Sequence, residues 1–413
     1  MHIRPRFPRF EVVAVVVPGL LLTGAVAVSA AVPHGGPVAT GTRVAVAARP
    51  TATPADALST ATGATHAPLA AVAPTPVPPP PAAPPVQAAA AIPPVPPAQS
   101  PLPGCPPPPP PPGGGPGGPP WHPDVLIPDS ALPPAAPATG PDASLTAVSG
   151  KGMWVWQYSR TEGGNMQAVV DRAMAAGLQE IWVRAGDSQD GFYAADQLAA
   201  LVPLAHARGL DVIAWGFPYL YDPVADAQWS AAVLNWRGPG GERVDGFSPD
   251  IEMASEGVML SAQRVAVYLG DVRPARDGRP LVATVYPPTD TRLTDYPFST
   301  MAPYVDAYAP MVYWECRDPG AAADEAVSRL RSMKPVTPIG QAFGMGDVGG
   351  RVDQPGPGEM NRFMGTARQD GAIGASFWVW QLMNGDEWNA LTAYYYPPVL
   401  PPLPEVPLLP AVH

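Results

Sequence analysis

The sequence predicts an α/β protein built as a (β/α)8 TIM barrel and preceded by a disordered segment rich in Pro and Ala. Between Gly152 and Pro397, short runs of β-branched and aromatic residues alternate with Ala-rich stretches of helical character. Eight such runs within roughly 250 residues match the size of an eight-stranded α/β barrel. The part before Gly150 differs in composition, because 33 of the 62 prolines lie between Pro50 and Pro141.

The eight predicted strands are mostly separated by helical patterns, as this class of barrel requires. They cover residues 153–158, 180–186, 211–217, 244–252, 281–287, 307–314, 337–343 and 374–380. Helical patterns follow the first, second, sixth and seventh strands, at 165–177, 194–209, 324–333 and 358–371. The connection after the fifth strand, residues 291–305, is weak as a helix. A doubly wound open sheet is the alternative, but no Gly-rich phosphate loop follows the first strand.

Residues 1–32 have the pattern of a secretory signal peptide. Three arginines, Arg4, Arg6 and Arg9, precede an apolar run over residues 12–32 that ends in small residues. An uncleaved N-terminal anchor is the alternative, because the run is nearly long enough to span a bilayer. Either assignment predicts a secreted or envelope-associated protein whose folded domain lies outside the cytoplasm, with membrane or cell-wall attachment through this segment as an option.

Residues 33–149 are predicted to be a disordered linker rich in Pro, Ala and Gly. Its extreme is "PPPPPPPGGGPGGPP" at residues 106–120. Such a tract buries too little apolar surface to offset the entropy lost on ordering, so we expect a semi-extended spacer. A low-complexity insertion without a role is the alternative. The tail at 398–413 is also Pro-rich, so the predicted barrel domain covers residues 150–397.

Net charge and cysteine content limit the ligands, metals and disulfides that the protein can have. The formal net charge is −11, and almost all of it belongs to the part after Gly150. An acidic domain argues against nucleic acid, whose binding needs a basic patch. Cys105 and Cys316 cannot build a disulfide framework, and a mutual bond, an intermolecular bond and free thiols remain open. The Cys and His spacing matches no metal motif, so we predict no metal. We also predict no cofactor and a monomeric barrel.

The stretch "RVDGFSPDIEM" (243–253) holds three of the few acids in an apolar region. Functional side chains of a parallel barrel gather at the C-terminal ends of its strands. Because side chains alternate along a strand, Ser248, Asp250 and Glu252 should share the inward face, with Glu252 at the rim of the mouth. Two carboxylates this close raise the pKa of one of them, which suits a general acid. The alternative is that they cap a helix or pair with Arg184.

The stretch "DGFSPDIE" resembles the D-G-x-D-x-D-x-E signature of the chitinase and endo-N-acetylglucosaminidase family, with Ser248 in place of the middle acid. "APMVYW" resembles that family's sixth strand, with Trp314 in place of an acid, and "GASFWVWQ" resembles its eighth. The resemblance implies a general acid at Glu252. It also implies that Asp250 orients the substrate's acetamido group and that Tyr313 holds it. A weaker likeness to barrel muramidases rests on the D-x-E pair and on "WQ" at 380–381.

Aromatic and polar residues near the predicted strand ends complete the candidate site. Aromatic rings that could stack on sugars are Trp215, Tyr286, Tyr313, Trp314, Trp378 and Trp380, with core packing as the alternative for each. Candidate substrate-binding polar residues are Arg184, Gln341 and Asp187. A second catalytic carboxylate, if the mechanism uses one, would come from Asp187, Glu315 or Asp386.

We therefore predict an exported glycoside hydrolase that cleaves a β-linked amino-sugar polymer, such as peptidoglycan or a related envelope glycan, by general acid catalysis. A non-catalytic carbohydrate-binding barrel and a cell-surface scaffold protein are the alternatives.

Overall fold

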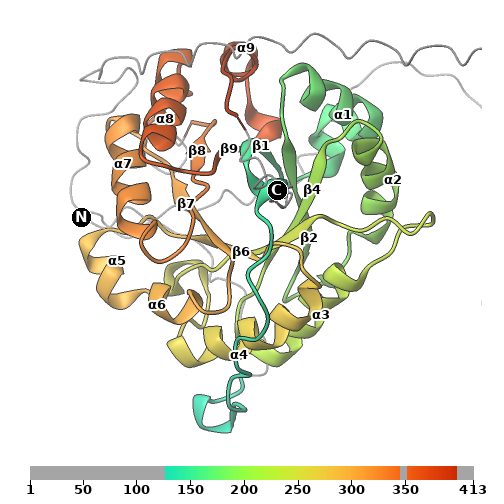
Figure 1. The fold of residues 1–413 in the computed structure, drawn as a ribbon, viewed down its shortest axis with the longest axis vertical. Helices are drawn as coiled ribbons and strands as arrows, with labels where there is room; N and C mark the ends of the chain where they lie inside the picture. Colours follow the sequence, from blue (N-terminus) through green and yellow to red (C-terminus); the bar gives the residue numbers. More distant parts are fainter. Residues whose placement is uncertain (1–125, 345–350, 398–413) are drawn as a thin grey trace, which may run out of the picture. The chain divides into compact units, whose positions relative to one another are not determined.

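The computed structural model describes residues 126–344 and 351–397, and its strands form a closed parallel barrel with helices around it (Figure 1). The predicted fold class is confirmed. The strands are β1 (Gly150–Val155), β2 (Glu180–Asp187), β3 (Gly191–Phe192), β4 (Asp211–Phe217), β5 (Gly246–Pro249), β6 (Val282–Val285), β7 (Ala307–Val312), β8 (Ile339–Gln341) and β9 (Gly374–Trp378). Eight of them lie in the order β5-β4-β2-β1-β9-β8-β7-β6, and the short β3 pairs antiparallel with β2.

The barrel closes between β5 and β6. Parallel bridges join Phe247 to Leu281 and Asp250 to Thr284. The backbone N–H of Phe247 donates to the carbonyl of Pro280 at 3.0 Å, and that of Ile251 donates to Thr284 at 3.0 Å. These contacts leave no open edge between the two strands, which excludes the doubly wound alternative.

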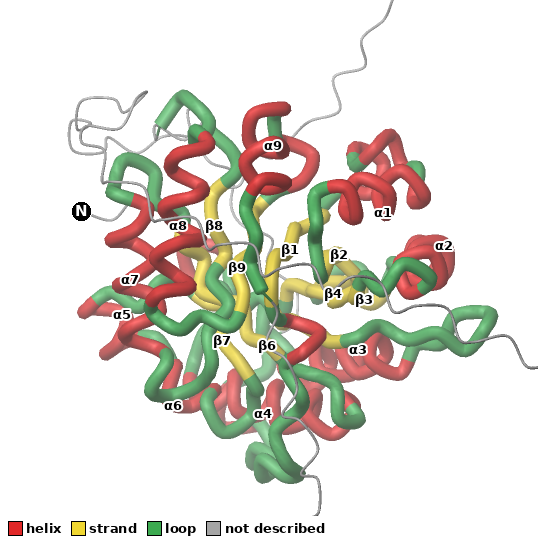
Figure 2. The backbone as a smooth tube through the Cα atoms, turned by 45° about the horizontal axis from the view of Figure 1, so that its top comes forward, coloured by secondary structure: helices red, strands yellow, loops and turns green. Residues whose placement is uncertain are grey.

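The helices lie outside the strands, as Figure 2 shows in red around yellow. They are α1 (Met166–Ala175), α2 (Ala195–His206), α3 (Pro223–Asn235), α4 (Ala262–Val272), α5 (Asp290–Asp295), α6 (Phe298–Met301), α7 (Pro319–Leu330), α8 (Pro357–Gln369) and α9 (Gly385–Ala393). The predicted weak fifth connection is two short helices, α5 and α6, separated by Tyr296–Pro297. The residue before a proline disfavours helical geometry, which accounts for the break. No helix in the described part of the chain is long and apolar enough to cross a bilayer.

Tryptophans from four adjacent strands fill one side of the barrel interior. Trp154 of β1 stacks on Trp182 of β2 with ring centroids 4.8 Å apart, and Trp215 of β4 lies 5.4 Å from Trp378 of β9. Gly152 makes room below them, because a Cβ there would lie 2.7 Å from a carboxylate oxygen of Glu180. This alternation of large and absent side chains lets the layers interdigitate.

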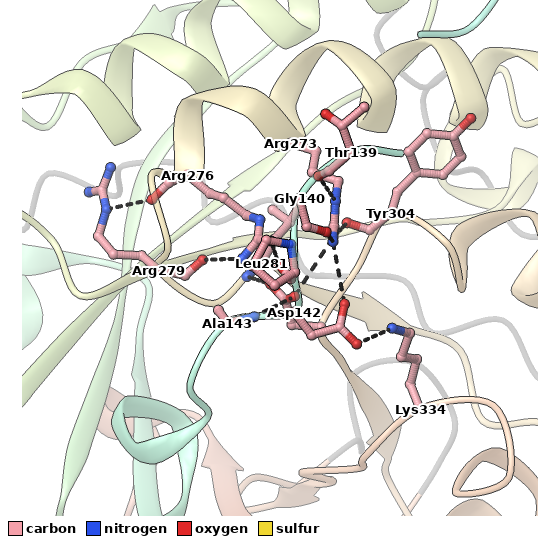
Figure 3. Close-up of polar contacts among 12 residues, drawn as sticks. Thr139, Gly140, Asp142, Ala143, Arg273, Arg276, Arg279, Leu281, Tyr304 and Lys334 are labelled. Atoms are coloured by element: carbon pink, nitrogen blue, oxygen red, sulfur yellow. Dashed lines mark hydrogen bonds and ion pairs between the residues drawn. The ribbon is translucent and has the colours of Figure 1, made fainter. Parts of the chain in front are cut away.

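Residues 126–149 are ordered against the barrel, although the sequence assigns them to the linker and starts the domain at residue 150. Figure 3 shows how arginines hold this segment, which we call the strap. Arg273 donates to the carbonyls of Thr139 at 3.1 Å and Gly140 at 3.3 Å. Lys334 donates to Asp142 at 2.9 Å, and the Ala143 N–H donates to Asp306 at 3.0 Å. The folded part therefore begins before the barrel's first strand.

The strap ends in a single 3-10 turn, Thr146–Val148, whose last residue is fully buried together with Ser149. Its buried end precedes β1, so it packs at the end of the barrel opposite the strand C-termini. The predicted signal peptide at 1–32, the linker up to residue 125 and the tail at 398–413 lie outside the described residues.

Candidate active site

Two buried carboxylates follow β5. Asp250 is 7% exposed and Glu252 is 0% exposed. The Asp250 N–H donates to Gly216 of β4 at 2.8 Å, so the backbone remains paired beyond Pro249. One layer below, the Ser248 hydroxyl donates to the Val282 carbonyl at 2.6 Å and lies 2.8 Å from the Thr284 hydroxyl. Ser248 therefore bonds to β6, not to Asp250.

Three of the four carboxylate oxygens are buried and have no hydrogen-bond donor among the described side chains and backbone groups. This is true of Oδ1 of Asp250 and of both oxygens of Glu252. Neither residue caps the next helix, because the Ser261 side chain caps α4. Buried polar atoms are nearly always hydrogen-bonded, so unsatisfied acceptors gathered in one place are typical of a site that binds a ligand or water.

Arg184 of β2 is the cation whose charge acts on Asp250. Burial raises the pKa of Asp250 to about 7, while the Arg184 charge lowers it and the Glu256 charge raises it. The Arg184 side chain pairs directly with Asp187 at 3.0 Å and not with Asp250. The ion pair considered as the alternative for Asp250 is therefore made by Asp187.

Glu252 is in a more strongly shifted environment. Burial raises its pKa well above the ordinary range, and the charges of Asp250 and Glu256 raise it further. The Tyr286 hydroxyl and Arg292 oppose this shift, although the Tyr286 contact falls short of hydrogen-bond geometry. Glu252 is therefore the group of the pair that holds a proton at neutral pH.

Tyrosines from the β6 and β7 side complete the surroundings of the pair. The Tyr296 hydroxyl donates to the Ile251 carbonyl at 2.5 Å. Burial raises the pKa of Tyr313, which follows β7, and the charges of Asp250 and Glu252 add to the shift. Arg184 lies near the C-terminal end of β2, the two acids follow the C-terminal end of β5, and Tyr313 follows that of β7. The two acids therefore share this end with Arg184 and Tyr313.

Several predicted substrate-binding residues lie together on the β2, β4 and β9 side. The Arg184 guanidinium lies 5.3 Å from the Trp215 ring centroid. The Trp215 indole N–H donates to Val155 at 3.1 Å, and its ring packs against Trp378. Asp187 also accepts N–H groups of the turn that follows it, at 2.9 and 3.0 Å. Asp187 therefore holds Arg184, and Trp215 packs against Trp378.

Other predicted residues have their polar atoms bonded within the protein. The Trp380 indole N–H donates to Glu162 at 3.0 Å, and its ring packs against Trp388 of α9 at 4.8 Å. Trp314 donates to Glu359 of α8 at 3.0 Å, so it faces the helices. Gln341 accepts the Glu315 N–H and donates to the Phe343 carbonyl, both at 2.8 Å. Asp386 is exposed in the first turn of α9.

Glu256 and Arg292 belong to the electrostatic surroundings of the pair but were not predicted. Glu256 ends the 3-10 turn Ala254–Glu256, and its charge raises the pKa of both acids. Arg292 of α5 lies 4.4 Å from the Tyr286 ring centroid. Only the nearness of Glu256 to "DIE" in the sequence could have indicated its role, because Glu256 lies in a 3-10 turn, where strand alternation no longer holds.

Within residues 126–344 and 351–397, no group of three or more His, Cys, Asp or Glu side chains is placed to hold a metal ion.

No model of a protein family and no curated protein matches the chain. Solved structures with a similar fold include the spore cortex-lytic enzyme SleL of Bacillus cereus, at 13% identity and a TM-score of 0.46, covering 62% of this chain and 76% of that one. A class V chitinase from Pseudomonas fluorescens has 13% identity and a TM-score of 0.43, covering 59% and 98%. An endo-β-N-acetylglucosaminidase from Cordyceps militaris has 14% identity and a TM-score of 0.39, covering 59% and 89%. At these identities the likeness concerns the fold alone.

Proposed function

We propose that the protein is a glycoside hydrolase that cleaves a β-linked amino-sugar polymer, with Glu252 as the general acid. The observation that carries this proposal is the buried pair Asp250 and Glu252 at the C-terminal end of the barrel, of which Oδ1 of Asp250 and both oxygens of Glu252 lack protein donors. Glycosidases need a protonated group that donates to the glycosidic oxygen. They also need an ionised group that acts at the anomeric carbon or, in this proposal, on the substrate's acetamido group.

The surroundings push the two acids toward different roles. Arg184 favours the anion of Asp250, whereas burial and the neighbouring acids keep the proton on Glu252. Glu252 would donate this proton to the glycosidic oxygen as the bond to the anomeric carbon breaks. Glu252 would then take a proton from the water that completes hydrolysis, which restores the starting state.

The second acid would act through the substrate. The Asp250 carboxylate would accept the N–H of an acetamido group, so that the acetamido oxygen attacks the anomeric carbon as the leaving group departs. Tyr313, whose pKa is raised by burial and further by the charges of both acids, would stay protonated and donate its O–H to that oxygen. In this route the acetamido oxygen is the nucleophile, so no protein carboxylate beyond Asp250 and Glu252 is needed, and Ser248 and Trp314 supply none.

We assign sugar contacts to those predicted residues that have an accessible ring or a polar atom without a protein partner. Trp378 is 8% exposed and lies over the tryptophans below, so we assign it to stacking on the sugar. Arg184 has a buried Nε without a protein partner, which suits a sugar hydroxyl. Tyr286 likewise has an unpartnered buried hydroxyl. Trp380, Gln341 and Asp187 would shape the loops of the site.

The proposed substrate is peptidoglycan or a related envelope glycan outside the cytoplasm. Residues 1–32 would direct export or anchor the chain, and the Pro-rich linker would carry a monomeric barrel away from that segment. The support for this part is the sequence pattern of the N-terminal half.

A non-catalytic carbohydrate-binding barrel is the second candidate. Ser248 favours this candidate. The family that the chain resembles has an acid at this position, whereas the Ser248 hydroxyl bonds to β6 and gives Asp250 no acidic neighbour. A scaffold function of the proline tract is the third, and it would leave the barrel without any glycan ligand.

The test compares the full chain with its Glu252→Gln variant on peptidoglycan and on N-acetylglucosamine oligomers. The proposal expects release of reducing ends by the wild type, loss of release in the variant, and similar binding by both. Binding without release by the wild type would support the second candidate, and no binding at all would support the third.

A further inference from the structure

An aromatic group lies on the rim of the barrel mouth outside the acid pair. It consists of Tyr193 after β3, Phe217 at the end of β4 and Tyr219 in the following loop. Tyr193 is 40% exposed, which makes it one of five exposed large hydrophobic side chains among the described residues. Phe217 and Tyr219 are half-buried, with ring centroids 4.7 Å apart. The three rings therefore leave part of their apolar surface uncovered at the rim, and an apolar surface edged by polar residues is typical of a binding site.

Backbone contacts join these residues to the segments that carry Arg184 and Glu252. The Tyr193 N–H donates to the Ala185 carbonyl, next to Arg184, at 3.1 Å. Phe217 is in register with Asp187, the partner of Arg184. The Tyr219 N–H donates to the Ser188 hydroxyl at 2.7 Å, which joins it to the β2–β3 turn. The Met259 N–H donates to the Tyr219 carbonyl at 2.9 Å, which joins it to the segment that follows Glu252. A ligand reaching from the acid pair across this side of the rim would meet these rings.

The loop that carries Tyr219 is held in one conformation by buried groups. Asp226 of α3 accepts the Leu220 N–H at 2.8 Å and the Trp229 indole N–H at 3.1 Å. Arg264 of α4 donates to the Leu220 carbonyl at 2.8 Å. Leu220 itself has φ of 59°, a left-handed conformation that costs energy for a residue with a Cβ. Such over-determined, strained loops are typical of sites where a side chain must be positioned.

Charges beside the rings limit what they can bind. Asp187 and Asp190 both act on the Tyr193 hydroxyl, and the opposing cation, Arg184, already pairs with Asp187. An anionic sugar would be repelled by Asp190, which is exposed and is not the partner of Arg184. A neutral pyranose would instead stack its apolar face on the rings and donate its hydroxyls to the acids.

We propose that Tyr193, Phe217 and Tyr219 form a second sugar-binding subsite that takes a neutral pyranose ring of the same glycan chain that Glu252 cleaves. This inference rests on the proposed glycosidase function. It adds that the enzyme prefers long chains, because a short oligomer cannot occupy the acid pair and the rim at once.

The experiment measures the affinity of the full chain, carrying Glu252→Gln to stop turnover, for N-acetylglucosamine oligomers of six and two units. Tyr193→Ala and Tyr219→Ala are expected to weaken hexamer binding by roughly five- to tenfold each, the effect of one lost aromatic contact. Dimer binding should stay the same. Tyr193→Phe keeps the ring and should bind the hexamer like the parent.

Tyr395→Ala is the matched control. Tyr395 is 46% exposed, and its neighbour Tyr394 accepts a bond from Lys151 at the start of β1, so it lies at the other end of the barrel. This variant should bind both oligomers like the parent.

The outcomes separate the two proposals. Hexamer binding and cleavage by the wild type with unchanged hexamer affinity in Tyr193→Ala would overturn the subsite and leave the glycosidase function standing. No binding or cleavage of either oligomer or of peptidoglycan by the wild type would overturn both. Tyr193→Phe as weak as Tyr193→Ala would contradict stacking. Binding of free peptidoglycan stem peptides that Tyr193→Ala removes would assign the rings to a peptide instead.

Discussion

The guanidinium of Arg184 lies 5.3 Å from the centroid of the Trp215 ring. Stacking on Trp215 and pairing with Asp187 at 3.0 Å fix the cation on two sides. Because its charge also acts on Asp250, the position of Arg184 decides which of the two acids ionises first. The family that this site resembles has a further acid where this chain has Ser248. In this protein a cation from β2 tunes Asp250.

Glu252→Gln should lower kcat on the cleaved glycan by about 10²- to 10⁴-fold, the contribution of a positioned general acid. The amide has the size of the carboxyl group but cannot give up a proton, so KM should change little. Steady-state kinetics with a soluble oligomer measure both quantities. Glu325→Gln, on the outer helix α7, is the control and should retain wild-type kcat. Wild-type turnover by Glu252→Gln would remove Glu252 from the mechanism.

Arg184→Met should shift the acidic limb of the pH profile of kcat/KM upward. Arg184 lowers the pKa of Asp250, which burial has raised to about 7, so removing the cation raises this pKa further. Since the proposed role needs the Asp250 anion, activity should then be lost at a higher pH, by about 1 pH unit. Arg172→Met on α1 should leave the profile unchanged. A downward shift or no shift in Arg184→Met would contradict the assigned role of Asp250.

Glu180→Gln should flatten the dependence of stability on pH. Glu180 lies fully buried inside the barrel, and burial followed by the Asp211 charge raises its pKa from 4.5 to about 8. The folded state therefore holds a proton that the unfolded state releases between these values. This contribution to stability is present below about pH 4.5 and is lost as the pH rises to about 8.

Thermal unfolding from pH 5 to pH 8 measures this effect. The wild type should lose more stability than Glu180→Gln over this range, by up to a few kcal/mol. Glu325→Gln, at a partly exposed position, should follow the wild type. Parallel curves for the wild type and Glu180→Gln would show that Glu180 is ionised in the folded state or reaches water.

Arg273→Met should weaken the attachment of the strap and lower the free energy of unfolding by about 2–4 kcal/mol, since a buried charge network loses a member. Arg273 is 4% exposed and bonds to Thr139 and Gly140 in the strap. Urea unfolding of the full chain measures the change. Arg208→Met breaks only an exposed pair with Asp171 and should stay within about 0.5 kcal/mol of the wild type. Equal effects of the two variants would mean that the bonds of Arg273 to the strap add no stability.

Strand alternation predicted the position of the acid pair because backbone pairing continues past Pro249, the last residue of β5. The Asp250 and Ile251 N–H groups still donate to Gly216 and Thr284. Asp250 and Glu252 are brought together with Tyr313 and Arg184, as their positions in the predicted strands indicated. Trp314 and Trp380 were grouped with the site because they lie near strand ends, but β7 ends at Val312 and β9 at Trp378. After these points the direction of a side chain depends on the turn, and both rings pack on helices.

The sequence by itself determined the class of fold and the position of the acid pair. Both follow from local periodicity, which neighbouring residues impose on one another. Only the tertiary structure decided how the barrel closes, which cation tunes Asp250, which aromatic rings stay accessible and where the folded part begins. The strap illustrates the reason, because a Pro-rich segment has no periodicity of its own. Its bonds come from arginines such as Arg273, 134 residues away from Thr139 in the chain, and no local pattern encodes such a contact.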